Sequence, residues 1–137
     1  MSKQRNFSVL AIVMFAFMST APTTIASPVY RYIITPVPDA GAPPGSPTIS
    51  QVALNKRHFS THDQIRMQVL TSSDVVKVTN HELGHGGTLR KVAPGIFSGT
   101  GRISGIPFFL KGMHVDMHYT ATTARGATTT VTAPVSF

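Results

Sequence analysis

Short runs of alternating apolar and polar residues recur along the chain from residue 48 to residue 137, and turn-forming residues separate them. Alternation with a period of two is typical of a strand that buries one face. No helical period of useful length accompanies these runs in the sequence. The pattern therefore predicts seven strands, at residues 49–54, 65–69, 75–83, 88–92, 96–103, 113–120 and 127–137.

Seven short strands within about ninety residues favour an all-β fold, in which two antiparallel sheets pack face to face as a β-sandwich. The chain contains no cysteine, so no disulfide framework supports this domain. Its stability must come from the apolar core between the sheets.

The first 26 residues have the pattern of a secretory signal peptide. Lys3 and Arg5 give a positive start, residues 7–18 are uncharged and mainly apolar, and residues 24–26 fit a cleavage site. An uncleaved membrane anchor is the alternative, but this apolar run spans only about 18 Å of a ~30 Å hydrocarbon core. We therefore expect an exported protein, periplasmic or extracellular, that meets a membrane only through its signal peptide helix during export.

The signal peptide (1–26) is followed by an N-terminal segment and linker (27–47) and by the sandwich domain (48–137). Residues 29–35 form a short, β-favouring run. Residues 36–47 contain five prolines, which is typical of an extended linker. Two alternatives are open for residues 29–35: pairing with a sheet edge, of its own domain or of a partner, or a disordered mature N-terminus.

The charge of the chain does not indicate a nucleic-acid partner. After residue 26, ten Lys and Arg residues oppose five Asp and Glu residues, so the formal charge is +5. The basic residues are scattered singly or in pairs, without the aromatic interleaving of a nucleic-acid groove. The expected partner is a protein or a cell-surface component of unknown identity.

The last strands resemble those of the bacterial immunoglobulin-like domains of exported proteins. The alternating strand at residues 113–122, Gly126, Val131 and Pro134-Val135 are similar to their last hairpin, and residues 94–99 to their turn into the fifth strand. The resemblance covers the predicted sandwich as a pattern, although the chain lacks the paired cysteines and core tryptophan of antibody-type domains. It implies an immunoglobulin-like module for adhesion, spacing or assembly, without catalytic residues.

Residues 81–85 spell His-Glu-Leu-Gly-His, the H-E-x-x-H signature of zinc peptidases. On a helix the two histidines lie one turn apart and share one ion, whereas on a strand they are about 13 Å apart. The β-branched residues at 75–79 favour a strand, and the glycines that follow disfavour a helix. We therefore expect a strand that ends in a glycine turn at residues 84–87, with His85 in a loop. A zinc peptidase is a remote alternative, and the protein is predicted not to be an enzyme.

A second arrangement of histidines follows from the implied immunoglobulin-like topology, in which the third and sixth strands are neighbours. Met113, Val115, Met117 and Tyr119 then face the core. His114, Asp116 and His118 face outward, and His81 on the third strand lies opposite one of them. Such a cluster could bind Zn²⁺ or Cu²⁺ or respond to pH at about 6.5, and the alternative is a polar, solvated sheet face. No other cofactor is predicted.

An apolar crossover precedes the sixth strand. It contains Ile106, Phe108, Phe109 and Leu110 and is bracketed by glycines. Two roles are open: an exposed interaction patch, or a cover over the open end of the sandwich, which we favour. The sequence thus predicts an exported, non-catalytic immunoglobulin-like module with a binding, spacing or assembly role. A periplasmic metal-binding protein is the alternative.

Overall fold

The computed structural model describes residues 29–37, 40–82, 85–103, 105–106 and 108–137, without the side chains of Glu82 and His85. The predicted signal peptide, residues 38–39 of the predicted linker and Pro107 of the crossover lie outside the described residues. Within the described part, no helix has the length and apolarity needed to cross a membrane.

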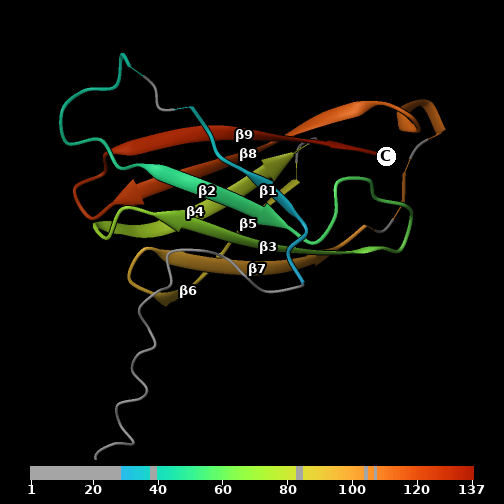
Figure 1. Ribbon diagram of the computed structural model, residues 1–137, viewed down its shortest axis with the longest axis horizontal. Helices are drawn as coiled ribbons and strands as arrows, with labels where there is room; N and C mark the ends of the chain where they lie inside the picture. The colour runs from blue at the N-terminus through green and yellow to red at the C-terminus, as the bar shows by residue number, and fades with distance from the viewer. Residues whose placement is uncertain (1–28, 38–39, 83–84, 104, 107) are drawn as a thin grey trace, which may run out of the picture.

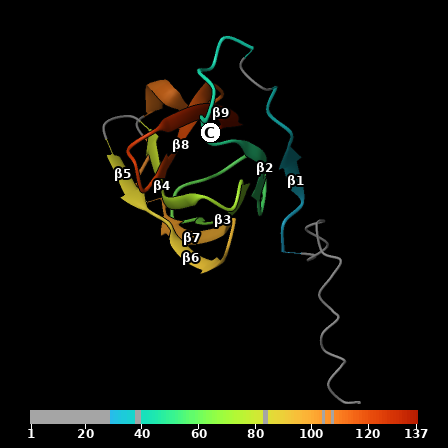
Figure 2. The ribbon, with the colours of Figure 1, turned by 90° about the vertical axis from the view of Figure 1, so that its left-hand side faces the viewer.

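The described residues form nine strands and a 3-10 turn, η3 (Phe108–Leu110). The strands are β1 (Tyr32–Ile34), β2 (Ile49–Leu54), β3 (Gln64–Thr71), β4 (Val75–Glu82), β5 (His85–Thr88), β6 (Arg90–Ala93), β7 (Ile96–Arg102), β8 (His114–Thr123) and β9 (Thr128–Ser136). One sheet has the order β1-β2-β3-β7-β6 and the other β5-β4-β8-β9, and all pairings are antiparallel. The two sheets face each other (Figures 1 and 2), which confirms the predicted all-β sandwich.

Strand alternation builds the core between the sheets. In β8, Met117, Tyr119 and Ala121 are buried, whereas the residues between them are half-buried or exposed. The buried Tyr119 hydroxyl donates a hydrogen bond across the core to Sδ of Met67 on β3, at 3.6 Å. Met113 is an exception to the predicted inward row, because it precedes β8 and is exposed. The other large side chains with almost no exposure include Phe59, Phe97, Leu54, Val52, Val69, Val75, Val78 and Val135.

The predicted single strand at residues 88–92 is wrong. The chain instead runs through β5 in one sheet and β6 in the other, with Leu89 between them. The Leu89 side chain is buried in the core, and its N–H donates to the carbonyl of Val78 at 2.8 Å. The chain therefore changes sheets at one apolar residue, and the continuous apolar-polar pattern hides this change.

Within the segment at residues 29–35, β1 pairs with β2 and forms the edge strand of the first sheet. The segment therefore pairs with its own domain. The Tyr32 hydroxyl donates to the carbonyl of Pro134 in β9 at 2.9 Å, so β1 also contacts the edge of the second sheet. The proline-rich segment is anchored where it ends. Pro47 is buried, and its carbonyl accepts a hydrogen bond from the Thr129 hydroxyl at 2.6 Å.

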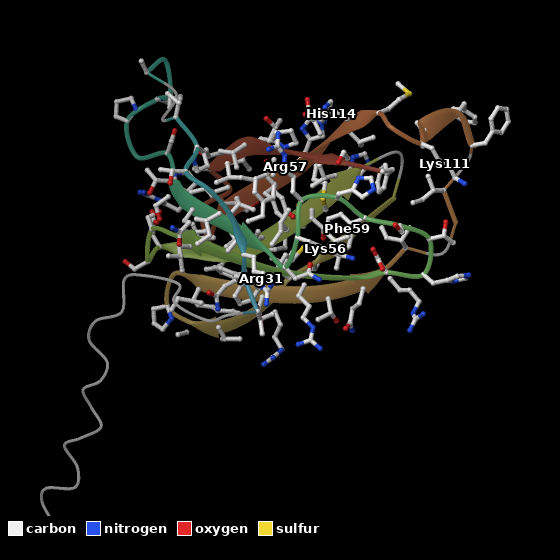
Figure 3. The ribbon with its side chains drawn as sticks, turned by 45° about the vertical axis from the view of Figure 1, so that its right-hand side comes forward. Arg31, Lys56, Arg57, Phe59, Lys111 and His114 are labelled. Atoms are coloured by element: carbon white, nitrogen blue, oxygen red, sulfur yellow. The ribbon has the colours of Figure 1, made fainter. Side chains whose placement is uncertain are left out.

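Phe59, from the turn between β2 and β3, fills the core toward one end of the sandwich (Figure 3). The sequence pattern indicates a polar turn between β2 and β3, but Phe59 in this turn is fully buried and belongs to the core. Its N–H donates to the carbonyl of Ser136 at 2.9 Å, and the N–H of Ser136 donates to the carbonyl of Arg57 at 3.0 Å. The turn is therefore hydrogen-bonded along the end of β9, and this pairing directs the Phe59 ring inward.

Candidate functional site

The H-E-x-x-H residues form part of a β-hairpin. His81 and Glu82 end β4 and His85 begins β5, so that His81 pairs with Gly86 and Glu82 with His85 in the ladder. The predicted strand is confirmed, but the predicted glycine turn and the loop position of His85 are wrong. Residues 83–84, between the two strands, lie outside the described residues. The helical arrangement that lets both histidines bind one zinc ion is therefore not formed.

Gly86 shows why a glycine-rich segment forms a strand here. A Cβ atom at this position would lie 2.6 Å from the carbonyl oxygen of Asn80 and 3.3 Å from Cδ2 of His81. The missing side chain therefore allows β5 to approach β4 closely. The rule that glycines mark turns does not cover a glycine within a strand that allows two backbones to approach closely.

His81 and His118 are direct partners in the β4–β8 ladder, and both are exposed. Residues directly opposite in an antiparallel pair have Cβ atoms about 4.5–5.5 Å apart. The prediction that His81 lies opposite one of the outward residues of β8 is therefore confirmed. Two imidazoles at this separation on one face are within reach of a single transition-metal ion.

His114 and Asp116 do not join this pair. They also face outward, as predicted, but their register partners are Ser136 and Pro134 on β9. Successive outward residues of one strand are about 6.6 Å apart along it. Within the described residues, no group of three His, Cys, Asp or Glu side chains is arranged to hold a metal ion.

The apolar crossover carries the most exposed aromatic side chains of the described residues. Phe108 and Phe109 are 85% and 63% exposed, and their rings pack edge to face with centroids 6.0 Å apart. Ile106 packs against the core, and Leu110 is half-buried. The favoured covering role is therefore wrong for Phe108 and Phe109, because most of each side chain is exposed to solvent.

Hydrogen bonds hold η3 in place although its rings are exposed. The N–H of Lys111 donates to the carbonyl of Phe108 at 3.3 Å, and the N–H of Met113 donates to that of Leu110 at 3.0 Å. Gly112 donates to Phe137, and Phe137 donates back to Met113. We call Phe108, Phe109 and the exposed Met113 the aromatic tip. It is a defined turn that presents apolar side chains to solvent.

The turn at residues 55–63, which lies at the same end as the aromatic tip, contains one acid, Asp63. Its Oδ2 lies 2.6 Å from Nζ of Lys56 and accepts a hydrogen bond from the N–H of Ser60 at 2.7 Å. The hydrogen bond from Lys56, followed by that from Ser60, lowers the pKa of the Asp63 carboxyl below its usual value. The carboxylate is thus held within its own turn by these two donors.

A cavity of about 530 Å³ lies between this turn and the crossover segment that carries the aromatic tip. Its lining includes His58 and Phe59 from one side and Ile106 and Lys111 from the other. Nδ1 of His58 lies 3.0 Å from Oγ of Ser136, which holds the imidazole against β9. Lys111 and His58 are far apart in the sequence but line the same cavity at this end of the sandwich.

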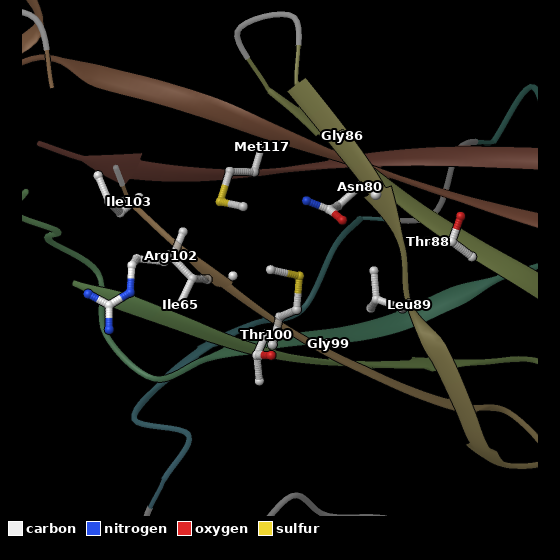
Figure 4. Close-up of a pocket in the computed structure, with 13 residues that line it drawn as sticks. Ile65, Asn80, Gly86, Thr88, Leu89, Gly99, Thr100, Arg102, Ile103 and Met117 are labelled. Carbon is white, nitrogen blue, oxygen red and sulfur yellow. The ribbon is translucent and has the colours of Figure 1, made fainter. Parts of the chain in front are cut away.

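A smaller cavity of about 230 Å³ opens between the sheets beside β5 (Figure 4). Asn80 and Met117 line it from one sheet, and Ile65, Gly99 and Arg102 from the other. The described residues that line it include no carboxylate and no imidazole.

Phe59 is the feature that sequence reasoning missed, whereas the exposure of Phe108 and Phe109 agrees with the alternative that was not favoured. The signal for Phe59 is a single aromatic residue within an otherwise polar turn at residues 55–63. Compared with known proteins, the chain matches no family model and no curated protein.

Proposed function

We propose that the protein is an exported, non-catalytic, immunoglobulin-like binding module that docks on a cell-surface partner through its aromatic tip. The observation that carries this proposal is the exposure of Phe108 and Phe109 on a hydrogen-bonded turn. Exposed aromatic side chains of this kind are costly in water and are typical of interaction sites.

The immunoglobulin-like assignment draws support from the strand order. Leaving β1 aside, β2, β3, β7 and β6 form one sheet and β5, β4, β8 and β9 the other. This order has the arrangement of an immunoglobulin sandwich with an added edge strand in the second sheet. Export draws support from the pattern of the first 26 residues.

Cell fractionation tests this proposal. In a bacterial host, we expect the full chain to be cleaved after residue 26 and to sediment with the cell envelope. The double variant Phe108→Ser/Phe109→Ser should instead appear in the soluble periplasmic fraction, because its partner loses two apolar contacts. The matched control is Val92→Ser, since Val92 is exposed on edge strand β6. A double variant that sediments like the wild type would overturn the role of the aromatic tip.

The register of His81 and His118 favours metal binding as a second candidate function. The two exposed imidazoles form a two-point site for Zn²⁺ or Cu²⁺, and solvent supplies the other ligands. Asp116 and His114 lie one and two outward positions away from His118 on the same face of β8, and neither is the register partner of His81 or His118.

Calorimetric titration of the mature chain with Cu²⁺ tests this second function. His81→Ala and His118→Ala should each weaken binding about tenfold or more, since one histidine alone cannot chelate. His114→Ala is the matched control, because this histidine is equally exposed but pairs with Ser136. Equal losses in all three variants, or no loss in any, would contradict the two-histidine site.

A further inference from the structure

The aromatic tip combines exposed apolar side chains with positive charge. Phe108, Phe109 and Met113 are 85%, 63% and 49% exposed, and Lys111 lies in the same turn. Figure 3 shows Lys111 at the end of the sandwich, beyond the strands. The turn is therefore an apolar projection with a cation at its base.

The neighbouring turn adds charge of the same sign. The segments at residues 55–63 and 103–113 together contain three Lys and Arg residues and one acid, Asp63. Of the three, Arg57 lies over the Tyr32 ring, 5.6 Å from its centroid, and Lys56 is paired with Asp63. Asp63 is hydrogen-bonded to Lys56 and to the N–H of Ser60, so it is directed into its own turn. Arg102 lies at the same end, where Nη1 is 3.4 Å from the carbonyl oxygen of His62. Lys111 and Arg102 therefore give this end of the sandwich a positive charge, which complements an anionic surface.

We propose that the aromatic tip docks on anionic lipid bilayers, with Phe108 and Phe109 at the boundary between headgroups and acyl chains. This inference rests on the proposed function, because it names the partner of the same site. It revises the expectation that the protein meets a membrane only through its signal peptide. Apolar side chains enter this boundary while neighbouring cations attract anionic headgroups.

The backbone of the tip is suited to this position. A polar backbone group that enters an apolar region without a partner is costly, so an open loop would resist insertion. In the tip, the N–H groups of Lys111, Gly112 and Met113 each donate to a carbonyl within the protein. The Lys111 side chain has an apolar stem and a charged head, so it can remain in the headgroup region while the rings go deeper.

A bilayer fits the shape of the tip better than a protein groove does. The two rings are exposed on a turn of three residues, and η3 contains no buried residue. The boundary of a bilayer is fluid and closes around a projection of this size without a preformed pocket. The formal charge of +5 on the mature chain acts over a longer range and favours the same partner.

A single tryptophan reporter tests the inference, because the chain contains no tryptophan. We expect Phe109→Trp emission to shift to the blue when vesicles of phosphatidylglycerol and phosphatidylcholine are added, and not with phosphatidylcholine alone. The matched control is Val76→Trp, at an exposed position near the opposite end of the sandwich, whose emission should not change. An unchanged Phe109→Trp spectrum on anionic vesicles would overturn the inference.

Vesicle sedimentation gives the magnitudes. Phe108→Ser/Phe109→Ser should weaken binding to anionic vesicles at least about tenfold, and Lys111→Gln should weaken it about fivefold at low salt. Equal binding to neutral and anionic vesicles would overturn the role of charge. If the envelope association depends on the tip but purified vesicles are not bound, the proposed function stands, and its partner is a protein rather than lipid.

Discussion

Replacing Phe59 with alanine is expected to lower the free energy of unfolding by about 3–5 kcal/mol. The ring is fully buried at the end of the core, and the two N–H···O bonds beside Ser136 prevent the turn from collapsing into the space left behind. Domains of this size are stable by only about 5–15 kcal/mol, so the variant should be marginally folded. Urea unfolding followed by circular dichroism measures the loss.

Phe109→Ala is the matched control for this prediction. It removes the same atoms from a side chain that is 63% exposed, so the unfolding free energy should change by less than about 0.5 kcal/mol. Similar losses in both variants would contradict the assignment of Phe59, rather than the aromatic tip, as the cover of the sandwich.

Gly95→Ala is expected to cost about 2–4 kcal/mol, the second large effect. Gly95 connects β6 to β7 with a φ of +76°, and an alanine there pays about 1–2 kcal/mol for the left-handed conformation alone. In addition, its Cβ would lie 2.7 Å from the carbonyl oxygen of Thr71. Because the N–H of Thr71 donates to the carbonyl of Gly95 at 2.8 Å, the two segments cannot move apart without losing this bond.

Gly126→Ala separates the two contributions. Gly126 has a φ of +92°, but a Cβ there would meet no atom within 4 Å. This variant should therefore show only the conformational cost of about 1–2 kcal/mol. Thermal unfolding of both variants measures the difference, and a Gly95→Ala variant as stable as Gly126→Ala would refute the close contact with Thr71.

Sequence alternation predicted most of the fold because the strand period is local. The outward positions of β8 follow from its one buried face. The prediction that His81 lies opposite one of them also needed the neighbouring strands implied by the immunoglobulin-like resemblance, and alternation did not give the partner, His118. The same rule failed at β5 and β6. There the chain changes sheets at Leu89 while the alternation continues, so the pattern does not show which sheet each residue joins.

The prediction also failed at the end of the sandwich, where Phe59 is buried instead of the crossover residues Phe108 and Phe109. This error has a different cause. Apolarity predicts that a side chain favours burial, but it does not predict which of several apolar segments occupies the core. Phe59 is directed inward because its turn pairs with the end of β9, a contact between residues far apart in the sequence. Phe108 and Phe109 are exposed instead. The residues of the candidate site were therefore predictable, and their exposure was one of two open alternatives between which the sequence pattern could not decide.

The change of sheet at Leu89 has a mechanical consequence. β5 belongs to one sheet, β6 to the other, and Leu89 between them is buried in the core. We therefore expect that the two sheets cannot separate along this edge unless Leu89 leaves the core. Amide hydrogens of the two strands should therefore exchange together, as a single opening unit. The covalent chain therefore links the two sheets directly along this edge.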